Sequence, residues 1–174
     1  MKMYFIRHTS VAVPVGTCYG QSDVAVKNTF PEEAASVLAQ INSISFDYVY
    51  CSPLSRCVKL ADFCGYSQAI FDSRLKELDF GAWELKRWEE INDPHLQIWY
   101  KDWINTRVTG GESFHDLYQR FTDFINEIPK ANTIAIFTHG GIINCARVYT
   151  GLTTQQQMFV QTPSYGSVTL IEMN

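Results

Sequence analysis

The 174-residue sequence predicts an α/β fold, a three-layer α/β/α sandwich with a mostly parallel central sheet. Short apolar runs of strand length alternate with longer segments of helical periodicity. The first run, residues 3–7, is apolar on both faces, which is typical of a central parallel strand. Hydrophobic residues make up 46% and charged residues 18%, an ordinary globular composition. Because no repeat or linker divides the chain, we expect one domain over residues 1–174.

A strand, a long loop and a helix are predicted first. The strand at residues 3–7 leads into residues 9–28, which contain Pro and Gly but little periodicity. A loop of that length in a compact domain is usually functional. Thr29-Phe30-Pro31-Glu32 is typical of a capping box with Pro in the first turn, and it predicts a helix to about residue 41.

Two further strands are predicted before the middle of the chain. Residues 46–51 form the second strand, and the Pro that follows it ends the run. A helix then extends to about residue 64, and residues 69–71 form a weak third strand. Residues 85–101 are rich in Trp and Leu and predict a helix interrupted near Pro94.

The second half continues the alternation. Gly110-Gly111-Glu112-Ser113 is a turn, and Ser113 or Gly111 caps a helix to about residue 127. Residues 133–137 form a strand, residues 141–149 a helix, and residues 167–172 a final strand. This β-α-β-α order implies parallel strands with helices on both sides.

Charge and cysteine content narrow the functional classes. The net charge of −4 provides no basic field for nucleic acid or an anionic membrane. The cysteines are odd in number, five, without a C-x-x-C pair, so we expect neither a disulfide framework nor a structural zinc site. No signal peptide is recognisable and no apolar run approaches the roughly 18 residues of a membrane span, so we expect a cytoplasmic protein.

Polar residues follow three of the predicted strands directly. Arg7-His8 follows the first strand, Ser52-Pro53-Leu54-Ser55-Arg56 the second, and Thr138-His139-Gly140 the strand at 133–137. Parallel strands bring their carboxyl ends to one edge of the sheet. Two arginines and two histidines there form a cationic pocket that suits phosphate, and helix N-termini after Ser52 and Gly140 add N–H groups.

Such a pocket predicts phosphoryl transfer. A neutral histidine nitrogen in line with phosphorus can act as a nucleophile and form a phosphohistidine. The leaving oxygen then needs a proton, for which Glu77 is the candidate, with Phe80 and Trp83 available to wall it in. From the residues alone, Asp79 and Glu84 are alternatives for this role.

Five motifs occur in the order seen in the histidine phosphatase superfamily, the phosphoglycerate-mutase-like group. They are Arg7-His8, the S-x-L-x-R run ending at Arg56, the L-x-E-x-x-F-G-x-W-E run that holds Glu77, the Gly110-Gly111-Glu112-Ser113 turn and Thr138-His139-Gly140. The resemblance covers nearly the whole chain and implies a phosphoglycerate-mutase-like fold. It implies His8 as nucleophile, Arg7, Arg56 and His139 as the phosphate pocket, Glu77 as proton donor, and neither metal nor cofactor.

The loop at residues 16–23 narrows the resemblance to one group of enzymes within the superfamily. Gly16-Thr17-Cys18-Tyr19-Gly20-Gln21-Ser22-Asp23 is similar to the G-x-C-Y-G-x-x-D stretch of α-ribazole phosphatases. This similarity implies a small-molecule phosphomonoester substrate, α-ribazole 5′-phosphate, used in assembling the cobalamin lower ligand. Tyr19 is then a candidate to stack on the leaving group, and Gly20, Gln21 and Gly140 are candidate substrate contacts.

Alternatives stay open at this point. They are a sugar-phosphate phosphatase or a phosphoglycerate mutase of the same superfamily, and a non-catalytic phosphoester-binding protein. Monomer and homodimer are both compatible with the sequence. Trp88, Trp99, Tyr100 and Trp103 are interpreted as a helical core face, or in part as a lid.

The chain departs from the family pattern at three positions. Thr9 follows His8 where the family usually has Gly, and Pro14 stands where an Asn is common. Leu85 stands where Gly is common. A side chain at Thr9 disfavours a positive φ, so the backbone after His8 is expected to differ slightly.

Overall fold

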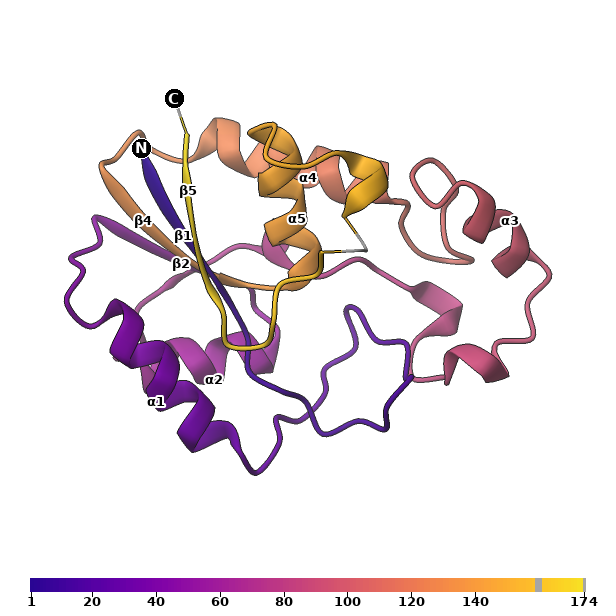
Figure 1. The fold of residues 1–174 in the computed structure, drawn as a ribbon, viewed down its shortest axis with the longest axis horizontal. Coiled ribbons are helices and arrows are strands. Elements are labelled where there is room, and N and C mark those ends of the chain that lie inside the picture. Colours follow the sequence, from indigo (N-terminus) through magenta and orange to yellow (C-terminus); the bar gives the residue numbers. More distant parts are fainter. Residues whose placement is uncertain (159–160, 174) are drawn as a thin grey trace.

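The computed structural model describes residues 1–158 and 161–173, in which five strands form one sheet (Figure 1). The strand order is β3-β2-β4-β1-β5. The strands are β1 (Lys2–Arg7), β2 (Tyr48–Cys51), β3 (Ile70–Phe71), β4 (Thr133–Thr138) and β5 (Val168–Glu172). Four run parallel and β5 is antiparallel at one edge, which confirms the predicted mostly parallel sheet.

The strand register brings three chain segments together at one edge of the sheet. Arg7 pairs with Thr138 and Cys51 with Phe137, so β1, β2 and β4 end at nearly the same level. The backbone bonds continue past the strands, since His8 N donates to Thr138 O at 3.1 Å and Ser52 N to Phe137 O at 2.9 Å. The groups that follow these strands therefore lie close together.

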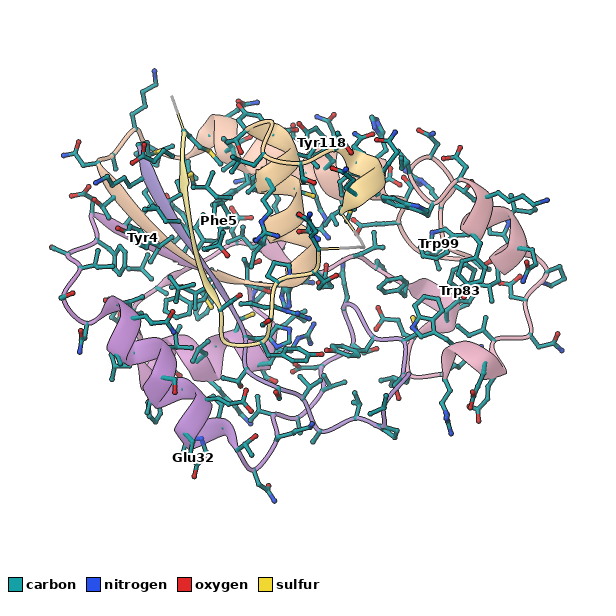
Figure 2. The ribbon with its side chains drawn as sticks, in the orientation of Figure 1. Tyr4, Phe5, Glu32, Trp83, Trp99 and Tyr118 are labelled. Carbon is teal, nitrogen blue, oxygen red and sulfur yellow. The ribbon has the colours of Figure 1, made fainter. Side chains whose placement is uncertain are left out.

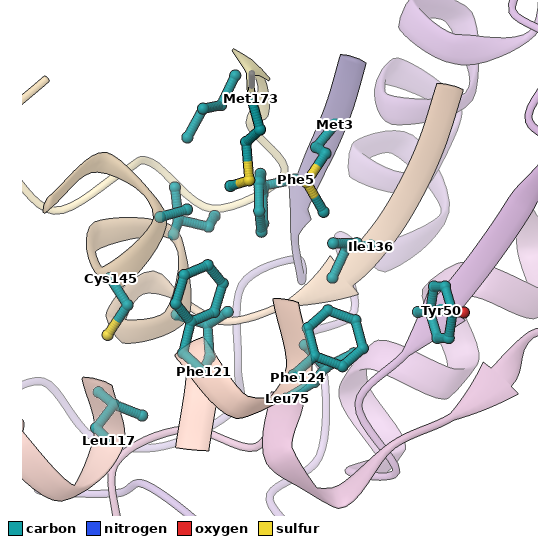
Figure 3. Packing of buried hydrophobic residues seen from close by; sticks show 14 of the residues in the cluster. Met3, Phe5, Tyr50, Leu75, Leu117, Phe121, Phe124, Ile136, Cys145 and Met173 are labelled. Carbon is teal, nitrogen blue, oxygen red and sulfur yellow. The ribbon is translucent and has the colours of Figure 1, made fainter. Parts of the chain in front are cut away.

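Helices cover both faces of the sheet (Figure 1). They are α1 (Phe30–Ile41) and α2 (Ser55–Phe63) on one face, and α4 (Phe114–Glu127) and α5 (Gly140–Tyr149) on the other. The alternation within β1 explains the three layers. Met3 and Phe5 pack with Phe121 and Phe124 of α4 (Figure 3), whereas Ile6 packs in the cluster of α1 and α2.

A third cluster lies beside the sheet and is built around tryptophans. Trp83 and Trp99 lie close together near α3 (His95–Lys101), well away from Phe5 (Figure 2). Trp99 belongs to α3 and is 5% exposed, and Trp83 is fully buried. We call residues 80–112, which carry this cluster, the cap.

The helix predicted over residues 85–101 is wrong except for α3. Residues 85–88 instead pair with the long loop, because Leu85 N donates to Cys18 O at 2.7 Å and Trp88 N to Gly16 O at 2.9 Å. Leu85 has a φ of 64°, in the left-handed region that favours glycine. Tertiary pairing thus overrides the helical periodicity, and the left-handed residue accounts for the Gly common at this position.

The remaining predicted elements are present, with ends within two residues of expectation. The predicted cap at Ser113 is confirmed, because Ser113 Oγ accepts from Asp116 N at 3.2 Å at the start of α4. The Asp116 carboxylate in turn accepts from Ser113 N at 2.9 Å, which completes a capping box. The capping box at Thr29 is wrong. Thr29 Oγ1 donates to the carboxylate of Glu33, which also accepts from Ser10 N and so ties α1 to the long loop.

Within residues 1–158 and 161–173, no helix has the length and apolar character needed to cross a membrane.

Candidate active site

Two histidines meet at the carboxyl edge of the sheet. His8 directly follows β1 and His139 directly follows β4, and their ring centroids are 5.2 Å apart. Their exposed fractions are 2% and 0%. The predicted convergence of these two side chains follows from the register of β1 and β4.

The His8 ring is oriented by its own neighbour. Its Nδ1 lies 2.8 Å from Thr9 O, and since a carbonyl only accepts, Nδ1 carries the proton in the neutral ring. Burial and the nearby charges of Arg56 and Arg7 hold the His8 pKa well below its ordinary value. His8 is therefore a neutral base with its lone pair on Nε2. Thr9 lacks a positive φ, so a side chain fits there without left-handed strain.

Side chains from α2 and from the residue after β2 contact the His139 ring. Ser52 Oγ lies 2.8 Å from its Nε2, and Cys57 Sγ lies 3.5 Å from the same nitrogen. Burial, and then the charge of Arg56, lower the His139 pKa well below its ordinary value. Burial also raises the pKa of Cys57 to about 12, so this thiol stays protonated.

Both arginines are anchored through their terminal nitrogens and keep an unpaired donor. Arg56, fully buried, donates from Nη1 to Ser22 O at 2.9 Å and from Nη2 to Gly20 O at 2.5 Å. Arg7 donates from Nη1 to Pro163 O. The Nε atoms of both are buried without a hydrogen-bond partner, as is Thr9 Oγ1. Buried unpaired donors beside His8 are suited to an anion.

Glu77 lines the same pocket, of about 300 Å³, as Arg7 and His8. Its Oε2 accepts from Gly141 N at 3.1 Å, at the start of α5, and its Oε1 from Leu78 N at 2.9 Å. Glu77 therefore shares one pocket with the side chains of Arg7 and His8.

The alternative carboxylates do not line this pocket and serve loops instead. Asp79 accepts from Gly81 N at 2.8 Å. Glu84 accepts from Gln21 N and Ser22 N at 2.7 and 2.6 Å, and from Phe80 N at 3.1 Å. Burial alone would raise the Glu84 pKa, but these hydrogen bonds outweigh it and lower the pKa. Glu84 is thus ionised, and its hydrogen bonds join the long loop to the cap.

The candidate substrate contacts divide into two groups. Tyr19 and Gly140 line the pocket, and the Tyr19 hydroxyl lies 2.5 Å from that of Tyr165. Gly20 and Gln21 do not line it, contrary to expectation. The Gly20 carbonyl is taken by Arg56, and Gln21 gives its backbone N–H to Glu84 and its side-chain amide to Glu77 O at 3.2 Å.

The helix starts are also occupied by carboxylates of this chain. The first amide of α2, Ser55 N, donates to Asp23 at 2.9 Å, and Ser55 Oγ donates to the same oxygen at 2.7 Å. At the start of α5, Gly141 N donates to Glu77. The predicted anion-binding helix start after Ser52 is therefore capped by Asp23.

Arg120 and Tyr165 are site residues that sequence reasoning missed. Arg120 of α4 donates to the carbonyls of Arg74, Lys76 and Glu77 at 2.6, 2.6 and 2.8 Å, and so holds the backbone that presents the Glu77 carboxyl. Tyr165 lies over the Arg7 guanidinium, with 4.1 Å from Cζ to the ring centroid. Neither has a local sequence signal, because each acts across a long separation in the chain.

No group of three or more His, Cys, Asp or Glu side chains in residues 1–158 and 161–173 is arranged to hold a metal ion.

Two buried histidines and two arginines with unpaired donors lie at the carboxyl edge of this α/β sheet, an arrangement suited to a phosphate ester. The family model described as "Histidine phosphatase superfamily (branch 1)" matches residues 3–174, and the chain belongs to this family and is a phosphatase.

Similar proteins have related names. "Adenosylcobalamin/alpha-ribazole phosphatase" of Escherichia coli (strain K12) is 25% identical over 154 residues, covering 83% of this chain and 76% of the relative. "Probable phosphoglycerate mutase GpmB" of Salmonella choleraesuis (strain SC-B67) is 26% identical over 157 residues, covering 83% and 72%. The crystal structure of the alpha-ribazole phosphatase from Shigella flexneri matches with a TM-score of 0.89 and 24% identity, over 100% of this chain and 91% of that one.

Proposed function

We propose that this phosphatase hydrolyses a small-molecule phosphomonoester through a phosphohistidine on His8. The observation that carries the proposal is that His8, whose Nδ1 lies 2.8 Å from Thr9 O, shares one pocket with Glu77 and Arg7. This contact leaves the lone pair of the neutral ring on Nε2, and burial lowers the His8 pKa. A neutral imidazole is the nucleophilic form of histidine. The pocket supplies it at neutral pH without a separate base.

The reaction has two steps. Arg7, Arg56 and His139 hold the phosphoryl group, whose oxygens take up the unpaired Nε–H donors of the two arginines. His8 Nε2 attacks phosphorus while the bond to the leaving oxygen breaks, and the Glu77 carboxyl protonates that oxygen. The Glu77 carboxylate then takes a proton from water, the water oxygen attacks phosphorus, the N–P bond breaks, and inorganic phosphate leaves.

The proposed substrate is α-ribazole 5′-phosphate. The name of the Escherichia coli relative supports it, as does the loop from Gly16 to Asp23, which carries Tyr19 into the pocket. A second candidate, phosphoryl transfer to a phosphoglycerate, is favoured by the relative that carries a mutase name. Hydrolysis and transfer differ in the final acceptor of the phosphoryl group, which makes them separable by experiment.

The test is phosphate release from α-ribazole 5′-phosphate, 3-phosphoglycerate, a nucleoside monophosphate and p-nitrophenyl phosphate, with EDTA present. We expect turnover strongest on the first compound, an acid-labile phosphoenzyme, and loss of both in His8→Ala. His115→Ala, which removes an exposed histidine, is the matched control. Turnover that survives His8→Ala would refute the mechanism, and formation of bisphosphoglycerate would favour the mutase.

We further propose that the chain acts in the cytoplasm as one domain, a monomer or homodimer, with no nucleic-acid or membrane partner. The net charge of −4 and five free, buried cysteines support this. Light scattering of the purified protein and fractionation of the source cells test it, and recovery with membranes would contradict it.

A further inference from the structure

The pocket that holds His8 has an aromatic wall. Tyr19 of the long loop and Phe80 and Trp88 of the cap line it together with Arg7 and His8. The Trp88 and Phe80 rings are 5.5 Å apart between centroids and meet at 89°, edge to face. Flat rings of this kind supply a large contact area for another flat group.

Trp88 is held in place from behind. Its ring is stacked on Trp99, with 5.9 Å between centroids and 21° between planes, and Trp99 is almost fully buried. The backbone N–H of Trp88 donates to Gly16 O at 2.9 Å, and Cys18 N donates to Lys86 O at 2.8 Å. These bonds join the cap to the loop that carries Tyr19, so the wall is preorganised.

Charge is confined to one part of the pocket. Among the lining residues that the structure describes, Arg7 is the single arginine, no lysine occurs, and Glu77 is the single carboxylate. A leaving group with its own carboxylate or second phosphate therefore has no further cation to pair with, and burying it unpaired is costly. The lining favours an uncharged leaving group.

We propose that Tyr19, Phe80 and Trp88 form a stacking subsite for an uncharged aromatic leaving group, and that Trp88 is its specificity-determining residue. The inference rests on the proposed function, because it assumes that the phosphoryl group is held by Arg7, Arg56 and His139. By this inference, residues of the cap, and not those that hold the phosphoryl group, select which class of phosphate ester is hydrolysed. By this assignment, 3-phosphoglycerate is a poor substrate.

The experiment compares two substrates that differ only by the aromatic group, α-ribazole 5′-phosphate and ribose 5-phosphate. The measured quantity is the ratio of their kcat/KM values. A stacked base contributes enough that its loss lowers the ratio by about 5- to 150-fold in Trp88→Ala. Trp88→Phe should retain most of the ratio. Tyr100→Ala, which removes a half-exposed ring of α3 outside the pocket, should leave it unchanged.

Binding of dephosphorylated α-ribazole, followed by tryptophan fluorescence, tests the subsite without turnover. We expect saturable quenching in the wild-type protein and its loss in Trp88→Ala, with no quenching by ribose. An unchanged ratio in Trp88→Ala, which includes an equal loss of kcat/KM on both substrates, would overturn the subsite while leaving the phosphatase chemistry intact. Quenching without hydrolysis of either ester would support the subsite and refute the proposed function.

Discussion

The carboxyl of Glu77 occupies the space where a side chain at Gly141 would begin. A Cβ at Gly141 would lie 2.1 Å from Glu77 Oε1, and Gly141 N donates to Glu77 Oε2 at 3.1 Å. The start of α5 thus both holds the proposed acid and requires glycine beside it. Because the obstructing atom ends a flexible side chain, the carboxyl is the group that would move.

Gly141→Ala is therefore expected to impair catalysis more than stability. A displacement of about 1 Å at a reacting group can lower kcat/KM by about 100-fold. Steady-state kinetics and urea unfolding measure the two effects separately. In a Glu77→Gln background the same substitution should add little, since the group it displaces no longer transfers a proton. Full additivity of the two substitutions would contradict this account.

Arg56→Lys is expected to fail despite keeping the charge. Arg56 places its donors on three separate nitrogens, two of which bind the Ser22 and Gly20 carbonyls, whereas a lysine carries all its donors on one nitrogen and cannot reproduce this planar fork. We expect kcat/KM to fall by about 10²- to 10³-fold and the free energy of unfolding by about 2 kcal/mol. Arg107→Lys, at an exposed pair with Asp116, is the control and should change neither. Near-normal kinetics of Arg56→Lys would refute the role of the guanidinium.

Stability should fall as the pH drops through about 6.5, the unfolded pKa of histidine. The folded-state pKa values of His8 and His139 are lowered, so below that pH the unfolded chain binds more protons than the folded protein. Each histidine then contributes a slope of about 1.4 kcal/mol per pH unit, with stability rising with pH. Urea unfolding between pH 5 and 8 measures this slope. His139→Asn should reduce this slope.

Leu85→Gly is expected to stabilise the protein. Leu85 adopts a φ of 64°, which costs a side chain about 1–2 kcal/mol, and its side chain is 60% exposed, so little packing is lost. Part of the gain is offset by the added freedom of glycine in the unfolded chain. The net rise in unfolding free energy should be about 0.5–1 kcal/mol. Leu85→Ala keeps the strain and should give no such rise in the same assay.

The positions of His8 and His139 were predictable because they depend on a local signal. Each follows an apolar strand directly, and parallel strands end at a common edge. The same reasoning located Arg56, which lies in the first turn of α2. These predictions needed no knowledge of which strand lies beside which.

What the sequence did not reveal depends on distant partners. Gln21 has two donors that could contact a substrate, its backbone N–H and its side-chain amide. Both are engaged within the protein, the first by the Glu84 carboxylate and the second by the Glu77 carbonyl. Arg120 has the local pattern of a surface cation on a helix, yet it holds the carbonyl of Glu77, 43 residues away in the chain. The tryptophans of the cap have helical spacing, but pairing with Gly16 and Cys18 keeps Trp88 out of an α-helix.

The strand order has a consequence for how the protein is made. β1 lies between β4 and β5, so the second residue of the chain finds its neighbours at Thr133 and Glu172. During synthesis, β1 leaves the ribosome long before either partner exists, and such non-local pairing is slow. The centre of the sheet therefore assembles only when translation of this segment is nearly complete. Arg7 and His8, which are made before β4 and β5, reach their working positions only after both of these strands have been made.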